Sequence, residues 1–229
     1  SHGSYEQYAD AKFKIGKALR RSPKRPRIMV ANADDREAVC YLELPVEKVV
    51  PFSLDEHEHS SSERGGHFVF DGMEISIQLP GEFSLKNALA AASLAHALDI
   101  PTSTIKRALE KIERIPGRAE KIQAGQDFAV VVDYAHTPDS LQALYDAYAG
   151  VRTICVLGGT GGGRDTWKRP VMGRIADEYC ADVILPNEDP YDEEPRAIVE
   201  EMKRDMQREP TIIMDRREAI RAALRAARP

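Results

Sequence analysis

The second half of the chain consists of short apolar runs that alternate with helical stretches of about ten residues. The apolar runs indicate strands at 128–134, 153–157, 183–185 and 211–214. The segments between them predict helices at 140–148, 170–179, 196–207 and 217–227. This alternation is typical of an α/β fold with a mainly parallel sheet. Ligands of such sheets bind beyond the carboxyl ends of the strands, so we expect functional residues in the loops that follow them.

The first half has a different pattern of apolar and polar positions. Ser4 followed by Gln7 predicts the start of a helix that reaches about residue 20. Alternating apolar residues on both sides of Asp71-Gly72 predict a β-hairpin. Short apolar runs at 28–31 and 49–52 indicate strands, and 85–98 and 103–112 predict helices. Because the period changes at Pro116-Gly117, we place a domain boundary there, which gives domains of 1–115 and 116–229.

Composition and charge narrow the functional classes. The 229 residues include 32 basic and 37 acidic side chains, a net charge of −5, which argues against a nucleic-acid partner. The longest apolar stretch, 88–98, is too short to span a bilayer, so we expect no membrane insertion. No secretory signal is visible, and Cys40, Cys155 and Cys180 lack zinc-binding spacing. These features favour a cytoplasmic protein. The basic run 20–27 is expected to be a solvated loop.

A glycine-rich loop follows the predicted strand 153–157. It has five glycines in six residues, 158–163, and continues with Arg164. Such a loop lets backbone N–H groups approach an anion closely, and an arginine can bind phosphate or carboxylate through two hydrogen bonds. The sequence fits neither the P-loop nor the dinucleotide-binding pattern. The alternative is a mobile surface loop.

Two further segments carry polar residues at strand ends or at the boundary. Asp133 and His136 end an apolar strand, where the carboxylate could accept hydrogen bonds from ribose or hold a metal, and the imidazole could stack. The alternative is a capping aspartate and a surface histidine. Arg118 and Glu120 lie two residues apart at the boundary, and on a strand both would face the same side. The alternative there is a surface ion pair.

Taken together, these segments resemble the Mur ligase family of ATP-dependent amide-forming enzymes. The matching segments appear in family order over nearly the whole chain: His2-Gly3-Ser4, Ala11-Lys12, Asn32 to Asp35, Gly81 to Ala91 around Asn87, Pro116 to Glu120, Asp133 to Ser140, Gly161 to Asp165, Lys168 to Gly173, and Asp189 to Pro195. The resemblance implies the end of a central ATPase domain over 1–115, followed by a Rossmann-like C-terminal α/β domain over 116–229. The family's P-loop and its G-K-G-H-E segment are absent from the chain, so we expect an internal fragment that is inactive alone.

The resemblance also implies an activity. The kind of family member that this chain resembles adds a diamino acid to UDP-N-acetylmuramoyl-L-Ala-D-Glu through an acyl phosphate, using ATP and Mg²⁺, in peptidoglycan precursor synthesis. We therefore expect these small molecules as partners, and a monomer. The alternatives are a non-catalytic nucleotide- or ligand-binding module and another amide ligase of the superfamily, such as a folylpolyglutamate synthase.

Residue roles follow from the resemblance position by position. His2 is expected to bind metal, and Lys12, as a carbamate, to support magnesium. Arg118 is expected to be catalytic and to bind ATP phosphate. The remaining expected ATP contacts are Asn87 for adenine, Asp133 for ribose, and His136 near the nucleoside. The expected contacts to the incoming amino acid are Arg164, Asp189, Tyr191 and Glu193.

The acidic loop departs from the family pattern. Relatives that add diaminopimelate carry Asn and Arg where this chain has Asp189 and Tyr191. Without that arginine, a second carboxylate on the substrate loses a bidentate partner. The loop therefore favours a substrate with a cationic side chain, such as lysine or ornithine. A further departure is Ser84, where relatives usually have Asn.

Overall fold

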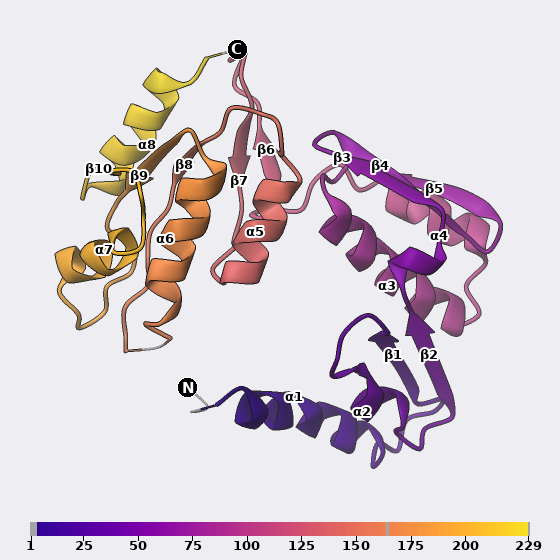
Figure 1. Cartoon of the computed structure of the whole chain (residues 1–229). Coiled ribbons are helices and arrows are strands. Elements are labelled where there is room, and N and C mark those ends of the chain that lie inside the picture. The colour runs from indigo at the N-terminus through magenta and orange to yellow at the C-terminus, as the bar shows by residue number, and fades with distance from the viewer. Residues whose placement is uncertain (1–3, 164, 229) are drawn as a thin grey trace. The chain divides into compact units, whose positions relative to one another are not determined.

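The computed structural model describes residues 4–163 and 165–228 (Figure 1). The chain divides into two compact units, which we call unit 1 (residues 1–114) and unit 2 (residues 115–229).

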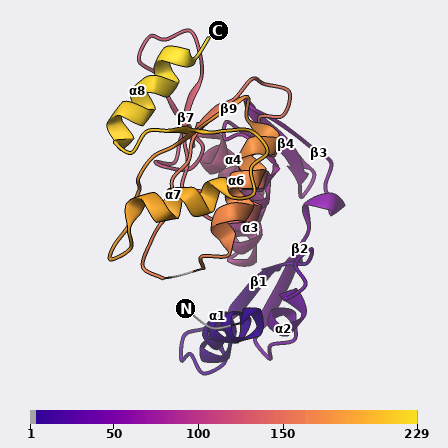
Figure 2. The same ribbon diagram turned by 60° about the vertical axis from the view of Figure 1, so that its left-hand side comes forward.

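Unit 1 contains a parallel strand pair and a three-stranded antiparallel sheet. Its helices are α1 (Tyr5–Leu19), α2 (Ala38–Leu42), α3 (Glu82–Ala97) and α4 (Thr102–Glu110), with a short 3-10 helix η1 (Leu54–Glu56). Its strands are β1 (Ile28–Asn32), β2 (Lys48–Phe52), β3 (His59–Ser62), β4 (Gly65–Phe70) and β5 (Met73–Ile77). Figure 2 shows β1 and β2 side by side, and α2 and α3 both contact this pair.

The local signals in unit 1 work as predicted. The Ser4 hydroxyl accepts a hydrogen bond from the Gln7 N–H at 3.3 Å and caps α1. Asp71 and Gly72 both have positive φ, 48° and 72°, which is the backbone that a two-residue hairpin turn requires. Strand β3 was not predicted, because its sequence, His-Ser-Ser-Ser, has no apolar alternation. It forms by pairing with β4.

The core of unit 1 lies between α3, α4 and the antiparallel sheet. Its fully buried side chains are apolar and come from the sheet, from α3 and from η1: Leu54, Phe68, Ile75, Leu85 and Leu89. The Ala-rich composition of α3 therefore has a structural reason, since small residues let the helix pack closely on the sheet.

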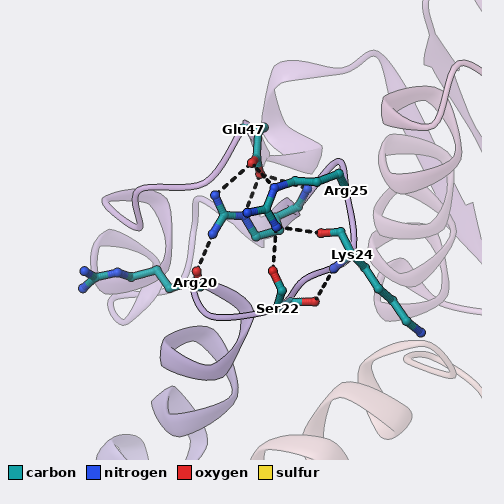
Figure 3. A network of polar contacts seen from close by, with 6 residues as sticks. Arg20, Ser22, Lys24, Arg25 and Glu47 are labelled. Carbon is teal, nitrogen blue, oxygen red and sulfur yellow. Dashed lines mark hydrogen bonds and ion pairs between the residues drawn. The ribbon is translucent and has the colours of Figure 1, made fainter.

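The basic run 20–27 is an exposed loop in which arginine side chains contact Glu47 (Figure 3). Glu47 accepts two hydrogen bonds from the Arg27 guanidinium, each at 2.8 Å, and one from the Arg27 backbone N–H at 3.0 Å. It also pairs with Arg25 at 2.8 Å. The guanidinium of Arg27 also donates to the Arg20 carbonyl. Hydrogen bonds from Arg27 lower the pKa of the Glu47 carboxyl from its ordinary 4.5 to about 2. The expected solvated loop is therefore present, with Arg25 and Arg27 bound to Glu47 at the protein surface.

Unit 2 has the alternating strand–helix order that the sequence predicts. Its strands are β6 (Glu120–Ile122), β7 (Val130–Val132), β8 (Ile154–Val156), β9 (Asp182–Leu185) and β10 (Thr211–Ile212). Its helices are α5 (Pro138–Asp146), α6 (Lys168–Tyr179), α7 (Pro195–Lys203) and α8 (Arg216–Ala226). Strands β8, β9 and β10 form a parallel sheet in the order β10-β9-β8, which confirms the α/β prediction. Strand β7 is shorter than predicted and pairs antiparallel with β6.

One cluster of buried side chains holds unit 2 together. It includes Leu141 of α5, Ile175 of α6, Leu185 of β9 and Met202 of α7. Cys155 and Cys180 are buried in the same cluster as free thiols. None of the helices in the described ranges combines the length and the apolar character needed to cross a membrane.

Candidate functional site

Two loops leave the parallel sheet of unit 2 at the same edge. The glycine loop (residues 158–163) follows β8, and the acidic loop (residues 187–194) follows β9. Because β8 and β9 are parallel neighbours, both loops begin at the carboxyl ends of their strands. The Gly161 N–H donates to the Asp189 carbonyl at 2.8 Å. A Cβ on Gly161 would overlap with the Pro190 carbonyl, so glycine is required for this close approach.

A buried arginine joins the two loops. Arg169, in the first turn of α6, is only 2% exposed. Its Nη1 and Nη2 atoms donate to the two carboxylate oxygens of Glu193 at 2.8 and 3.0 Å. Nη2 also donates to the Thr160 carbonyl at 3.0 Å, and Nη1 to Glu201 at 2.9 Å. The guanidinium thus contacts the glycine loop, the acidic loop and α7 at once.

Both carboxylate oxygens of Glu193 accept hydrogen bonds within the protein. Besides Arg169, it accepts a hydrogen bond from the Gly163 N–H at 2.6 Å. Hydrogen bonds from Arg169, and then from Gly163, hold the pKa of the Glu193 carboxyl below its usual range. We predicted Glu193 as a contact to an amino-acid substrate, but both of its oxygens are bound within the protein. Arg169 lies in the segment Lys168 to Gly173 that carries the family resemblance, but the sequence did not predict its contacts to Glu193 and Glu201.

The other predicted residues of the acidic loop point to solvent. Asp189 is exposed, and Tyr191 is 61% exposed with a positive φ of 52°. The side chain of Tyr191 lies near Gly162, so it borders the glycine loop. Arg164, the predicted partner of an α-carboxylate, lies outside the described residues.

Asp133 ties together two turns beside β7. One carboxylate oxygen accepts from the Ala119 N–H at 2.7 Å, and the other accepts from the Ala135 N–H at 2.6 Å. Ala119 has a positive φ of 45°, a conformation that this hydrogen bond supports. Each oxygen keeps a further lone pair, so the carboxylate can still accept from a hydroxyl group.

Three side chains form an exposed row next to Asp133. The guanidinium carbon of Arg118 lies 5.0 Å from the centroid of the Tyr134 ring, and the His136 ring lies 4.9 Å from the same ring. Tyr134 is 62% exposed. An exposed aromatic ring flanked by a cation and an imidazole can stack on a base and contact a phosphate. Arg118 and His136 were expected from the sequence, whereas Tyr134, which stands between Asp133 and His136, was not.

Arg118 and Glu120 do not lie on one strand, so they do not face the same side in the way that a shared strand would require. The Glu120 carboxylate accepts from the Gly117 N–H at 2.9 Å, and Arg118 lies before β6 rather than within it. Thr137 and Ser140 form a capping box that starts α5, with Pro138 in the first turn. The segment 133–140 is therefore fixed at both of its ends.

The candidate residues of unit 1 lie on helix surfaces. Lys12 is exposed on α1, with its Nζ 5.4 Å from the centroid of the Tyr8 ring. Asn87 is exposed on α3. Ser84, one turn earlier, is buried and donates to the Pro80 carbonyl at 2.6 Å. His2 lies outside the described residues, and within residues 4–163 and 165–228 no three His, Cys, Asp or Glu side chains are grouped to hold a metal ion.

Two family models match the chain. The Mur ligase middle domain matches residues 1–95, and the Mur ligase glutamate ligase domain matches residues 117–229.

Individual relatives agree with these models. The UDP-N-acetylmuramoyl-L-alanyl-D-glutamate–2,6-diaminopimelate ligase of Syntrophomonas wolfei is 44% identical over 169 residues, which covers 71% of this chain and 34% of the relative. The ligase of the same name from Halalkalibacterium halodurans is 33% identical over 240 residues, covering 99% of this chain and 49% of the relative. A solved structure of a ligase of that name has a TM-score of 0.57 at 26% identity and covers the whole chain and 50% of its own. The chain spans about half the length, or less, of the curated relatives it matches.

Proposed function

Since the chain belongs to the Mur ligase family, we propose that it is part of an ATP-dependent ligase that adds a diamino acid to UDP-N-acetylmuramoyl-L-alanyl-D-glutamate. The name "the ligase" is used below for a protein that includes this chain and has the full length of the relatives. The observation that carries the proposal is the 44% identity to a ligase named for this reaction. The polar loops at the carboxyl ends of β8 and β9 support it, because substrates of α/β domains bind at that edge.

In the proposed reaction, ATP phosphorylates the terminal carboxylate of the nucleotide-linked dipeptide. The amine of the incoming amino acid attacks the acyl phosphate, an amide bond forms, and phosphate leaves. Positive charge must balance the developing negative charge. Arg118 is our candidate for this role beside the ATP phosphates, with Tyr134 and His136 against the nucleoside and Asp133 accepting from ribose.

Unit 1 is proposed to supply the remaining groups. Asn87 offers an amide on the exposed face of α3 that can hydrogen-bond adenine. Lys12 is proposed to react with carbon dioxide to give a carbamate, which provides the hard oxygen ligands that Mg²⁺ prefers. The Lys12 amine, once it has lost its proton, would add to carbon dioxide and release a second proton. Its exposed position on α1 leaves it accessible to this reaction. Bound Mg²⁺ would neutralise phosphate charge.

The incoming amino acid is proposed to bind between the glycine loop and the acidic loop. The relatives are named for 2,6-diaminopimelate, whose second carboxylate would need a cationic partner. This chain offers Asp189 and Tyr191 in the acidic loop, so lysine or ornithine remains our expectation for the preferred diamino acid.

Phosphate release by the ligase tests the proposal. We expect release only when ATP, the UDP-linked dipeptide and a diamino acid are all present, and a new amide in the product by mass spectrometry. Release that does not depend on the dipeptide, or that requires a folate in its place, would contradict the proposal. The 229-residue chain alone is the matched negative control, because it contains no P-loop sequence to bind the ATP phosphates.

A further inference from the structure

Arg169 has the most connected side chain near the proposed amino-acid pocket, although it is too deeply buried to touch a substrate. It is 2% exposed, and its two terminal nitrogens make four hydrogen bonds. The partners belong to three separate segments: the glycine loop, the acidic loop and α7. A planar guanidinium suits this task, because its donors point in fixed directions and can bind a carboxylate through two bonds.

The free energy needed to bury the Arg169 guanidinium indicates that its ion pairs do more than stabilise the fold. Burying a guanidinium removes it from water, and replacing such a pair with apolar residues is often neutral or stabilising. Among the residues that the structure describes, the Nε atom of Arg169 has no hydrogen-bond partner. A buried donor without a partner lowers stability. The arrangement therefore calls for a role beyond holding the fold together.

The position of the four bonds suggests that role. Arg169 donates to the Thr160 carbonyl on the glycine loop and to the Glu193 carboxylate on the acidic loop. Glu193 in turn accepts a hydrogen bond from the Gly163 N–H of the glycine loop. These contacts set the spacing between the two loops at the edge of the sheet where β8 and β9 end. Asp189 and Tyr191 lie on the acidic loop just before Glu193, so their positions depend on the same contacts.

We propose that Arg169 is the positioning residue of the amino-acid pocket, holding the glycine loop and the acidic loop at the spacing in which they bind the incoming amino acid. This inference rests on the proposed function. Arg169 acts through Glu193 and Thr160 and does not contact the reacting atoms. Its loss should therefore weaken amino-acid binding more than it slows the chemical step.

The test compares Arg169→Lys with Arg208→Lys in the ligase. Lysine keeps the charge but cannot bind the three segments together. Arg208 is a matched control, because it too binds a buried acid, Asp177 at 2.7 Å, and backbone carbonyls, but at the other end of α6. We expect Arg169→Lys to raise KM for the amino acid about tenfold or more, while KM for ATP and kcat change less than about threefold. Arg208→Lys should leave all three within about twofold.

Equal KM values for the two variants, or a loss of kcat alone, would overturn the inference. If Arg169→Lys does not fold, Glu193→Gln gives the same test, since it keeps the side-chain size and weakens the contacts of Glu193 to Arg169 and to the Gly163 N–H. It should raise the same KM by a smaller factor.

Hydrogen exchange separates this inference from the proposed function. In the 229-residue chain, Arg169→Lys should speed exchange at the Gly161 and Gly163 amides, which donate to the acidic loop, and Arg208→Lys should not. A ligase that adds no amino acid would refute the proposed function even if exchange changes as expected. Unchanged exchange at both glycines would refute the holding role of Arg169 even if the ligase is active.

Discussion

Units 1 and 2 present their candidate residues in opposite ways. In unit 2, Asp133 and Glu193 lie in loops, and backbone N–H groups bind both carboxylates. In unit 1, Lys12 and Asn87 project from the exposed surfaces of helices, and the helix alone sets their positions. Substitutions in unit 1 should therefore change chemistry without changing stability, whereas those in unit 2 should change both.

The largest effect is expected for Lys12→Ala in the ligase. Loss of the proposed carbamate should lower kcat by roughly 100-fold or more, since a group that supports charge neutralisation is removed. Because Lys12 is exposed on a helix, the free energy of unfolding should change by less than about 0.5 kcal/mol. Kinetics and urea denaturation measure the two quantities.

The control for Lys12 is Lys14→Ala, another exposed position on α1, which should keep activity within about twofold. A short carboxylic acid added to the Lys12→Ala enzyme should restore part of the rate. Full activity of Lys12→Ala without added acid would show that Lys12 is only a surface residue. The claim that exposed helix residues of unit 1 contribute to the chemistry would then fail for Lys12.

The second prediction concerns the acidic loop of unit 2. We expect kcat/KM for lysine or ornithine to exceed that for meso-diaminopimelate, because Asp189 repels a second carboxylate and attracts an ammonium. Asp189→Asn with Tyr191→Arg should shift the preference toward diaminopimelate. Each charged contact contributes about 1.5–3 kcal/mol, or about 10- to 150-fold. Competition kinetics with both amino acids measure this ratio, and a preference of the unsubstituted ligase for diaminopimelate, as its relatives' names suggest, would refute the charge argument.

The third prediction compares stability between the units directly. Asp133→Ala leaves the Ala119 and Ala135 N–H groups without their acceptor and should destabilise the chain by about 1–3 kcal/mol. Asn87→Ala, on the exposed face of α3, should change stability by less than about 0.5 kcal/mol. Urea denaturation of the 229-residue chain provides both values. A similar loss of unfolding free energy in both variants would contradict the distinction between residues bound in loops and residues exposed on helices.

The smallest effect is expected for Glu47→Gln, which tests whether unit 1 also has an acid held by its surroundings. Its folded pKa, about 2, is below its ordinary 4.5 because of Arg27. The unfolded chain therefore binds this proton more readily, so the carboxylate stabilises the fold above pH 4.5. That contribution disappears as the pH falls toward 2. Glu47→Gln should be less stable at pH 7 in urea denaturation, with a difference that shrinks between pH 4.5 and 2.

The parts of the fold that depend on neighbours in sequence could be predicted. The Ser4 cap, the Asp71-Gly72 turn and the Thr137 cap each rest on residues within three positions of one another, so local composition was sufficient. Strand β3 could not be predicted, because its pairing with β4 outweighs a serine-rich sequence with no strand signal.

The candidate site shows the same division. Loops at strand ends were expected from the alternation of strands and helices, and Asp133 and the glycine loop lie there. The roles of Arg169 and Glu193 depend on a contact across 24 residues, which no local pattern reveals. From the sequence, Glu193 was expected to be available to a substrate. The fold shows that both of its carboxylate oxygens accept hydrogen bonds from Arg169 and Gly163.

Gly161 has a consequence for how this pocket can change over generations. Any side chain there would overlap with the Pro190 carbonyl and push the acidic loop outward. The glycine loop is therefore closed to point substitution at this position, whereas Asp189 and Tyr191, exposed on the opposing loop, can vary at little cost to the fold. At the proposed pocket, selection for a new amino-acid substrate would find accessible mutations at Asp189 and Tyr191, whereas Gly161 would stay fixed.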